Sequence, residues 1–160
     1  MNYGFWVVAI LCFFPASCTS PAEEAEKAVR AYNKALVLAY RTGDMTELEK
    51  FAGDNEVRKI RVLMDLKRSQ GMVLESTLES LKVVSSQTSG TDSILVETKE
   101  RWRYQDRMVQ PGKPPGQLFV SEMNMEYTCE KESDQWKVTE LRTKANRVIN
   151  QAGKVISKKT

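Results

Sequence analysis

Two glutamates occupy positions where a strand is expected to point into the protein core. Residues 93–104 alternate between apolar or β-favouring side chains and charged ones, which predicts a strand with one buried face. Glu100 falls on the buried register of this strand, and Glu140 falls on the inward register predicted for residues 135–142. Burial raises the pKa of a carboxyl group, so two such groups on facing strands could serve as general acid and base. The alternatives for Glu100 are an ion pair with an arginine such as Arg142, or a place at the rim of the fold.

The composition excludes several other kinds of active site. The 160 residues include no histidine, which removes the usual general base near neutral pH, the Ser-His and Cys-His pairs and most zinc sites. No glycine-rich phosphate loop, Cys-x-x-Cys, His-Glu-x-x-His or Gly-x-Ser-x-Gly motif is present. Because no histidine can activate its thiol, Cys129 is expected to be a small buried hydrophobic residue. We therefore expect no metal and no cofactor.

The N-terminus is typical of an export signal. Residues 4–14 form an uncharged apolar run that is short for a bilayer span and has the length of a signal-peptide core. Small residues then precede Cys18, and this pattern resembles the lipobox of bacterial lipoproteins. The resemblance implies that the signal peptide, residues 1–17, is removed, that Cys18 is lipidated and that residues 18–21 tether the protein to the membrane. A conventionally cleaved secretory signal and an uncleaved anchor are the alternatives, and all three export the protein.

Three helices are predicted in series in the first half of the chain. A capping box begins at Ser20, and the apolar positions that follow it have helical spacing up to Gly43. A second capping signal predicts a short helix over residues 44–52. A third helix is predicted to begin at Asp54 and to end at Gly71.

From Leu78 onward the hydrophobic period changes from about 3.6 to 2, which predicts strands. Turn-forming residues divide this part of the chain into hairpins. The order of helices followed by strands predicts an α+β fold, with the N-terminal helices packed on a curved antiparallel sheet of about four strands. The predicted strands are a first one from Leu78 through Leu81 and Val83, then Ser93–Tyr104, Gln117–Lys131 and Gln135–Arg142.

The inward register of these strands is aromatic and rich in methionine. Core packing is the default role of such a set, and the alternative is that it lines a pocket for an apolar ligand or a peptide. Ser121 is a further polar residue on the inward register. The candidate pocket wall comprises Glu100, Trp102, Tyr104, Met123, Met125, Tyr127 and Trp136.

The C-terminal segment, residues 144–160, is basic and amphipathic. Its apolar residues recur at helical spacing among lysines and arginines, and no acidic residue follows Glu140. This pattern predicts a C-terminal helix. The helix could pack on its own domain, fray as a tail, lie on anionic lipid or occupy a partner's groove.

The layout resembles the cone-shaped nuclear transport factor 2-like superfamily, which also holds ketosteroid isomerase and polyketide-cyclase relatives. The resemblance is carried by the helices that precede the strands, by Glu100-Arg101-Trp102 on the long second strand and by the closing run Trp136-Lys137-Val138-Thr139-Glu140-Leu141. Residues 22–143 are most similar to the family that contains the intermembrane-space domain of a plastid-division protein. The resemblance implies a pocket between sheet and helices, acid–base chemistry by buried carboxyl groups in the isomerases, and pairing of some members as homodimers through the outer face of the sheet.

These observations favour an exported, lipid-anchored, noncatalytic binding or assembly module of the cell envelope. Its expected partners are the membrane, through Cys18, and either a protein or an apolar ligand. The alternatives are a small isomerase-like or cyclase-like enzyme that uses Glu100 and Glu140, and a purely structural dimerisation domain. Nucleic acid is not expected, because export removes that partner and the basic residues of the third helix then form a solvated face; they are Arg58, Lys59, Arg61, Lys67 and Arg68.

Overall fold

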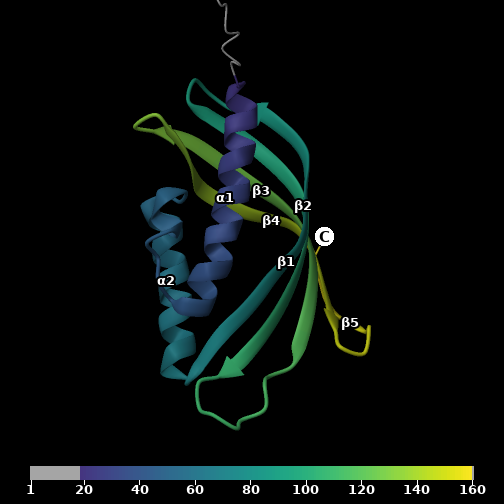
Figure 1. Ribbon diagram of the computed structural model, residues 1–160. Coiled ribbons are helices and arrows are strands. Elements are labelled where there is room, and N and C mark those ends of the chain that lie inside the picture. Colours follow the sequence, from purple (N-terminus) through teal and green to yellow (C-terminus); the bar gives the residue numbers. More distant parts are fainter. Residues whose placement is uncertain (1–18, 160) are drawn as a thin grey trace, which may run out of the picture.

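The computed structural model describes residues 19–159, which form two α-helices, one short 3-10 helix and a sheet of five strands (Figure 1). The predicted signal peptide, residues 1–17, and the predicted lipidation site, Cys18, lie outside the described residues. In chain order the elements are α1 (Pro21–Thr42), η1 (Leu48–Lys50), α2 (Asp54–Ser69), β1 (Met72–Thr88), β2 (Ser93–Met108), β3 (Leu118–Glu132), β4 (Gln135–Asn150) and β5 (Val155–Lys159).

The first and third predicted helices are confirmed as α1 and α2. The backbone N–H of Glu23 donates to Ser20 Oγ at 3.3 Å, and the N–H of Ser20 donates to the Glu23 carboxylate at 3.1 Å, which completes the capping box of α1. Gly43 ends α1 with a φ of 71°, a left-handed conformation that glycine adopts without steric strain.

The short helix predicted over residues 44–52 is reduced to the single turn of η1. The backbone N–H of Val138 in β4 donates to the carbonyl of Phe51, and the N–H of Gly53 donates to the carbonyl of Val138, both at 2.9 Å. These bonds hold the chain extended beside the sheet, so a helix cannot continue there. Pairing with a distant strand overrides the local helix signal.

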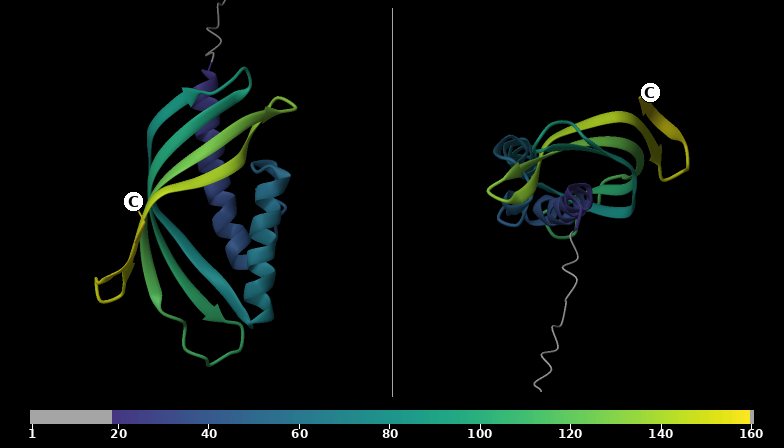
Figure 2. Two further views of the ribbon diagram at one scale, coloured as in Figure 1. Left: turned by 180° about the vertical axis from the view of Figure 1, so that it is seen from behind. Right: turned by 90° about the horizontal axis from the view of Figure 1, so that it is seen from above.

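The strands pair in chain order, β1-β2-β3-β4-β5, and each is antiparallel to its neighbours. The sheet is strongly curved, and α1 and α2 lie on its concave side (Figures 1 and 2). The predicted α+β fold is therefore confirmed, with five strands in the described residues where about four were predicted. The first strand also begins at Met72, earlier than the predicted Leu78.

The prediction of a C-terminal helix is wrong, because residues 144–159 extend the sheet. β4 continues to Asn150, and after a turn β5 pairs back onto it. The first half of β3 needs hydrogen-bond partners for its backbone, and β4 supplies them through pairs such as Ser121 with Val148. Gly153 takes a φ of 76° in the turn between β4 and β5.

The core lies between the concave face of the sheet and α1. Trp102, Tyr32 and Tyr127 are its largest fully buried side chains, and Trp136, near the first turn of α1, is also buried. The inward register predicted for the second and third strands is therefore confirmed. Within residues 19–159, neither α1 nor α2 is both long and apolar enough to cross a membrane.

Candidate functional site

Glu100 is buried on the concave face of the sheet, where hydroxyl and indole groups donate to it. Thr98 Oγ1 and Tyr127 Oη donate to its Oε1 at 2.7 and 2.5 Å, and Trp102 Nε1 donates to its Oε2 at 2.7 Å. Thr98 and Trp102 share a face with Glu100 because alternate residues of a strand point the same way. No lysine or arginine of the described residues pairs with Glu100, so the considered ion pair with Arg142 is not formed.

A second layer of hydrogen bonds connects Glu100 to α1. Asn33 Nδ2 donates to Tyr127 Oη at 2.9 Å and to the carbonyl of Val29 at 3.0 Å. Tyr127 therefore accepts one hydrogen bond from α1 and donates another to Glu100. Asn33 and Thr98 are not among the predicted site residues, although each is a polar residue on a register that otherwise faces the core.

The tyrosine of this network is held as a hydrogen-bond donor. Burial raises the pKa of Tyr127 well above its ordinary value of 10, and the neighbouring Glu100 raises it further. Burial likewise raises the pKa of Tyr32 and of Tyr104. These phenols stay protonated at neutral pH, so they can donate hydrogen bonds but cannot act as bases.

Glu140 lies on the opposite face of the sheet from Glu100. Val138 points inward and is buried, and a regular strand would keep Glu140 on the same side. Cys129 of β3 pairs with Val138, but the next residue pair is Thr128 with Glu140, so a bulge adds one residue to β4 between them. Because Thr128 points outward, Glu140 points outward with it. Its carboxylate then forms an ion pair with Arg142 at 3.0 Å. The predicted acid–base pair is therefore not brought together.

The other predicted wall residues lie on the inner face. The rings of Trp102 and Tyr104 stack with centroids 5.7 Å apart, Met125 and Trp136 are buried, and Met123 is partly buried. The sequence therefore placed these side chains on the correct face. Their role in ligand binding stays a prediction.

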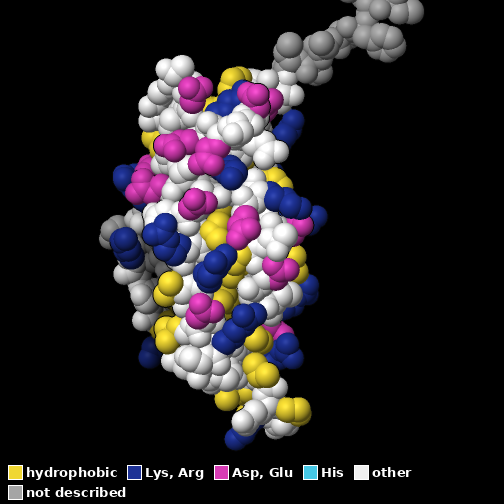
Figure 3. Space-filling model, turned by 90° about the vertical axis from the view of Figure 1, so that its left-hand side faces the viewer, with side chains coloured by type: hydrophobic (Ala, Val, Ile, Leu, Met, Phe, Trp, Pro, Cys, Tyr) yellow, Lys and Arg dark blue, Asp and Glu magenta, His cyan; other side chains and the backbone are white. Residues whose placement is uncertain are grey.

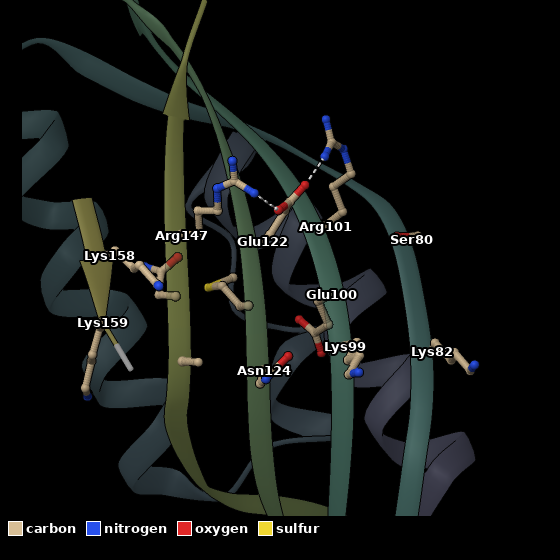
Figure 4. Close-up of a pocket in the computed structure, with 13 residues that line it drawn as sticks. Ser80, Lys82, Lys99, Glu100, Arg101, Glu122, Asn124, Arg147, Lys158 and Lys159 are labelled. Atoms are coloured by element: carbon tan, nitrogen blue, oxygen red, sulfur yellow. Dashed lines mark hydrogen bonds and ion pairs between the residues drawn. The ribbon is translucent and has the colours of Figure 1, made fainter. Parts of the chain in front are cut away.

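The outer face of the sheet carries a hollow of about 410 Å³ that crosses from β1 to β5 (Figure 4). Glu122 lies between Arg101 and Arg147 at its edge and forms ion pairs with both. The hollow is not predictable from local sequence, because its residues come from separate strands and the charged side of each strand alone has the pattern of a solvated face. The cationic residues that line it are Lys82, Lys99, Arg101, Arg147, Lys158 and Lys159.

The cations of α2 are arranged differently from those of the hollow. On the side of the molecule where α2 lies, lysines and arginines are interspersed with acidic side chains (Figure 3). The α2 cations that form ion pairs are Lys59 with Glu56, Arg61 with Glu49 and Lys67 with Asp106, at 2.5, 3.0 and 2.7 Å.

Among the described residues, no group of three or more His, Cys, Asp and Glu could hold a metal ion.

Comparison with known proteins relates the chain to others by its fold. No family model matches it, and no curated protein matches it in sequence. The intermembrane space region of the chloroplast protein ARC6 is similar with a TM-score of 0.67 and 19% identity, over 78% of this chain and 97% of that one.

Two further solved structures have lower scores. A type 2 hexachlorocyclohexane dehydrochlorinase, LinA, gives a TM-score of 0.48 and 8% identity over 83% of this chain and 89% of that one. The Kfla4162 protein from Kribbella flavida gives 0.47 and 9% over 85% and 95%. The architecture and the similarity to the ARC6 region show the fold alone: the chain has the cone-like α+β fold of nuclear transport factor 2-like proteins.

Proposed function

We propose that this protein is a noncatalytic binding or assembly module that a lipid anchor at Cys18 holds at the cell envelope. The observation that carries the proposal is the contrast between the two faces of the sheet. On the inner face, both oxygens of Glu100 are already occupied by donors of the same chain. On the outer face, a lined hollow is open to solvent.

The envelope location rests on the N-terminal sequence. An apolar run of signal-peptide length precedes Cys18, and the pattern resembles a bacterial lipobox. The ARC6 region, which has a similar fold, is an intermembrane space region. That protein is therefore one example of this fold in a compartment next to a membrane. A compact domain on a short tether, residues 18–21, suits a protein that presents a binding face close to a membrane.

Anchoring is tested by fractionation of cells that express the full chain. Wild type and a Cys12→Ala control are expected in the membrane fraction after a high-salt wash, and Cys18→Ala is expected in the soluble fraction. Mass spectrometry is expected to find acyl chains on Cys18 of the wild type. Cys18→Ala that remains in the membrane fraction would contradict the proposed anchor.

An enzyme that uses Glu100 alone is the second candidate function. It is favoured by Tyr32, whose buried hydroxyl has no hydrogen-bond partner among the described residues and whose pKa is raised by burial and, to a smaller extent, by Glu100. It is disfavoured by the outward position of Glu140, which removes the second carboxylate of the predicted pair.

Glu100→Gln separates the two functions. In a strain that lacks the wild-type gene, a binding module carrying this change is expected to restore the wild-type phenotype whenever the variant folds. An enzyme that uses Glu100 would lose activity while its circular dichroism spectrum stayed native. Failure of a folded Glu100→Gln protein to complement would therefore replace our proposal with the catalytic one.

The dimerisation alternative is not favoured by the outer face of the sheet. Charged residues cross this face in rows, such as Arg101 opposite Glu122 and Glu126 opposite Arg142. Stable homodimer interfaces are apolar at their centre and depleted of charge. A charged outer face suits a charged ligand better than a second copy of the same surface.

A further inference from the structure

Two lysines with no acidic partner face each other on the outer surface of the sheet. Lys82 of β1 lies directly opposite Lys99 of β2, and both side chains are exposed. Like charges at directly opposed positions destabilise a sheet. Within the described residues, neither lysine forms an ion pair, so this repulsion is not relieved by the protein itself.

The surroundings of this pair form a shaped site. The row that begins with Lys82 and Lys99 continues across the sheet through Asn124 and Ala145. These two side chains are small, and they form the floor of the hollow of about 410 Å³. The labelled residues of Figure 4 show lysines on both sides of this floor, with Lys158 approaching from β5.

The hollow carries an excess of positive charge. Six lysines and arginines line it, whereas the carboxylate that opens into it is that of Glu122. Glu100 also lines the hollow, but its carboxylate accepts hydrogen bonds from Thr98, Trp102 and Tyr127 on the inner face. Arg101 and Arg147 share Glu122, which leaves four lysines without an acidic partner in the described part of the chain: Lys82, Lys99, Lys158 and Lys159.

We propose that this hollow binds an anion that carries phosphate groups. The ammonium groups of Lys82, Lys99 and Lys158 supply mobile point charges, and the exposed amide of Asn124 supplies a neutral donor. A phosphate group offers several oxygens to such donors at once. A bound anion also removes the Lys82–Lys99 repulsion, so folding and binding favour each other. The inference deepens the proposed function by naming the ligand chemistry, and it rests on that proposal only for the cellular setting.

Calorimetric titration of the purified protein with sodium tripolyphosphate tests the proposal. Tripolyphosphate is expected to bind, and to bind more weakly as salt is added, because salt screens exposed charges. Each exposed charge contributes up to about fivefold to such an affinity. Lys82→Gln with Lys99→Gln is therefore expected to weaken binding about tenfold, whereas Lys34→Gln with Lys113→Gln, a matched loss of two lysines elsewhere, is expected to leave it unchanged. No binding, or equal loss in both double variants, would overturn the proposal.

Ala145→Trp tests whether the hollow itself is needed. The change fills the floor with a side chain that strands accommodate and alters no charge. Binding is expected to be lost while the melting temperature stays close to that of the wild type. A folded Ala145→Trp protein that still binds tripolyphosphate as well as wild type would show that diffuse surface charge, and not this site, attracts the anion.

Vesicles distinguish a lipid headgroup from a soluble phosphate compound. The Cys18→Ala protein is mixed with vesicles of phosphatidylglycerol and phosphatidylcholine, or of phosphatidylcholine alone, and sedimented. Cosedimentation with the anionic vesicles that the Lys82→Gln, Lys99→Gln variant loses supports a headgroup. Tripolyphosphate binding without cosedimentation supports a soluble ligand. Cosedimentation that the double variant retains overturns the assignment of a headgroup to this hollow. Failure of the anchoring test leaves this titration unaffected, so the two proposals fail separately.

Discussion

Glu100 is a carboxyl group in the protein interior that is surrounded by neutral hydrogen-bond donors. Trp102 Nε1 donates to one oxygen, and the hydroxyls of Thr98 and Tyr127 donate to the other. Buried polar groups destabilise a fold unless they are hydrogen-bonded. The indole N–H of Trp102 can only donate a hydrogen bond, and Glu100 is its acceptor. Removing Glu100 would therefore leave this buried donor unpaired.

Replacing Glu100 is expected to destabilise the fold in proportion to the donors left unpaired. Glu100→Ala should lower the free energy of unfolding by about 2–3 kcal/mol, because buried donors lose their acceptor. Glu100→Gln keeps an acceptor oxygen for Trp102 and should lower it by about 1 kcal/mol. Urea denaturation measures both. The control is Glu140→Ala, which removes an exposed ion pair and should change the value by less than about 1 kcal/mol. Equal losses for Glu100→Ala and Glu140→Ala would mean that the buried network contributes nothing.

The two glutamates also show how far single residues can be placed from sequence. Glu100 was predicted correctly as an inward residue because the alternation of its strand is regular. Glu140 was placed on the wrong face because the bulge in β4 arises from pairing with β3, and no local residue signals it. Asn33 donates to Tyr127 across elements far apart in sequence, so its partner could be identified only from the structure.

Glycines with positive φ end two of the elements. Gly43 follows α1 with a φ of 71°, and an ideal Cβ added there would come within 1.9 Å of the Arg68 guanidinium, which donates to the carbonyl of Thr42. Gly71 follows α2 with a φ of 69°, and no atom lies within 4 Å of its ideal Cβ. The two positions share the same backbone requirement and differ in their neighbours.

Alanine substitutions at these glycines are expected to separate backbone strain from a lost contact. Gly71→Ala should lower the free energy of unfolding by about 1 kcal/mol, from positive φ alone. Gly43→Ala should lower it by a further 0.5–1 kcal/mol or so, because Arg68 must move away from Thr42. Thermal or urea unfolding of both variants provides the comparison. The same loss at both sites would show that the Arg68 contact does not stabilise α1.

The bounds of helix α1 depend on residues close in sequence, and the sequence predicts them correctly. The capping box at Ser20 and the glycine at residue 43 set the bounds of α1, and the structure confirms them. Residues 44–52 carry a helix-capping signal and residues 144–159 carry helical spacing, yet both segments form backbone hydrogen bonds with strands elsewhere in the chain. Hydrophobic periodicity does not contain that information, so the helix predicted after residue 143 is a strand hairpin instead.

The fold buries Tyr32 and Tyr127 fully and Tyr40 and Tyr104 in part. Burial raises the pKa of Tyr40 to about 12, from an ordinary value of 10. Burial also raises the pKa of Tyr32, Tyr104 and Tyr127. In the unfolded chain these phenols ionise near their ordinary pKa, whereas in the folded protein they keep their protons to higher pH.

The fold is therefore expected to lose stability in alkali. A group whose folded pKa is raised contributes stability that is fully present below the unfolded pKa and is lost as the pH rises through the folded pKa. For Tyr40 the loss should begin near pH 10 and continue to about pH 12, with the other phenols adding to it. Urea midpoints measured against pH test this. Tyrosinate absorbance should appear together with unfolding, and phenols that ionise while the circular dichroism spectrum stays native would contradict their burial.

The chain-order pairing of the sheet also bears on how the protein reaches its native state. Every strand lies beside its predecessor, so each pairing closes a hairpin and requires no crossing over a distant segment. Loop closure over short separations loses little chain entropy, and such contacts form quickly. A hairpin such as β3–β4, whose turn residues Ser133 and Asp134 both have positive φ, can form before α1 is in place. Because Asn33 meets Tyr127 across 94 positions of the chain, we expect α1 to dock more slowly than the β3–β4 hairpin closes.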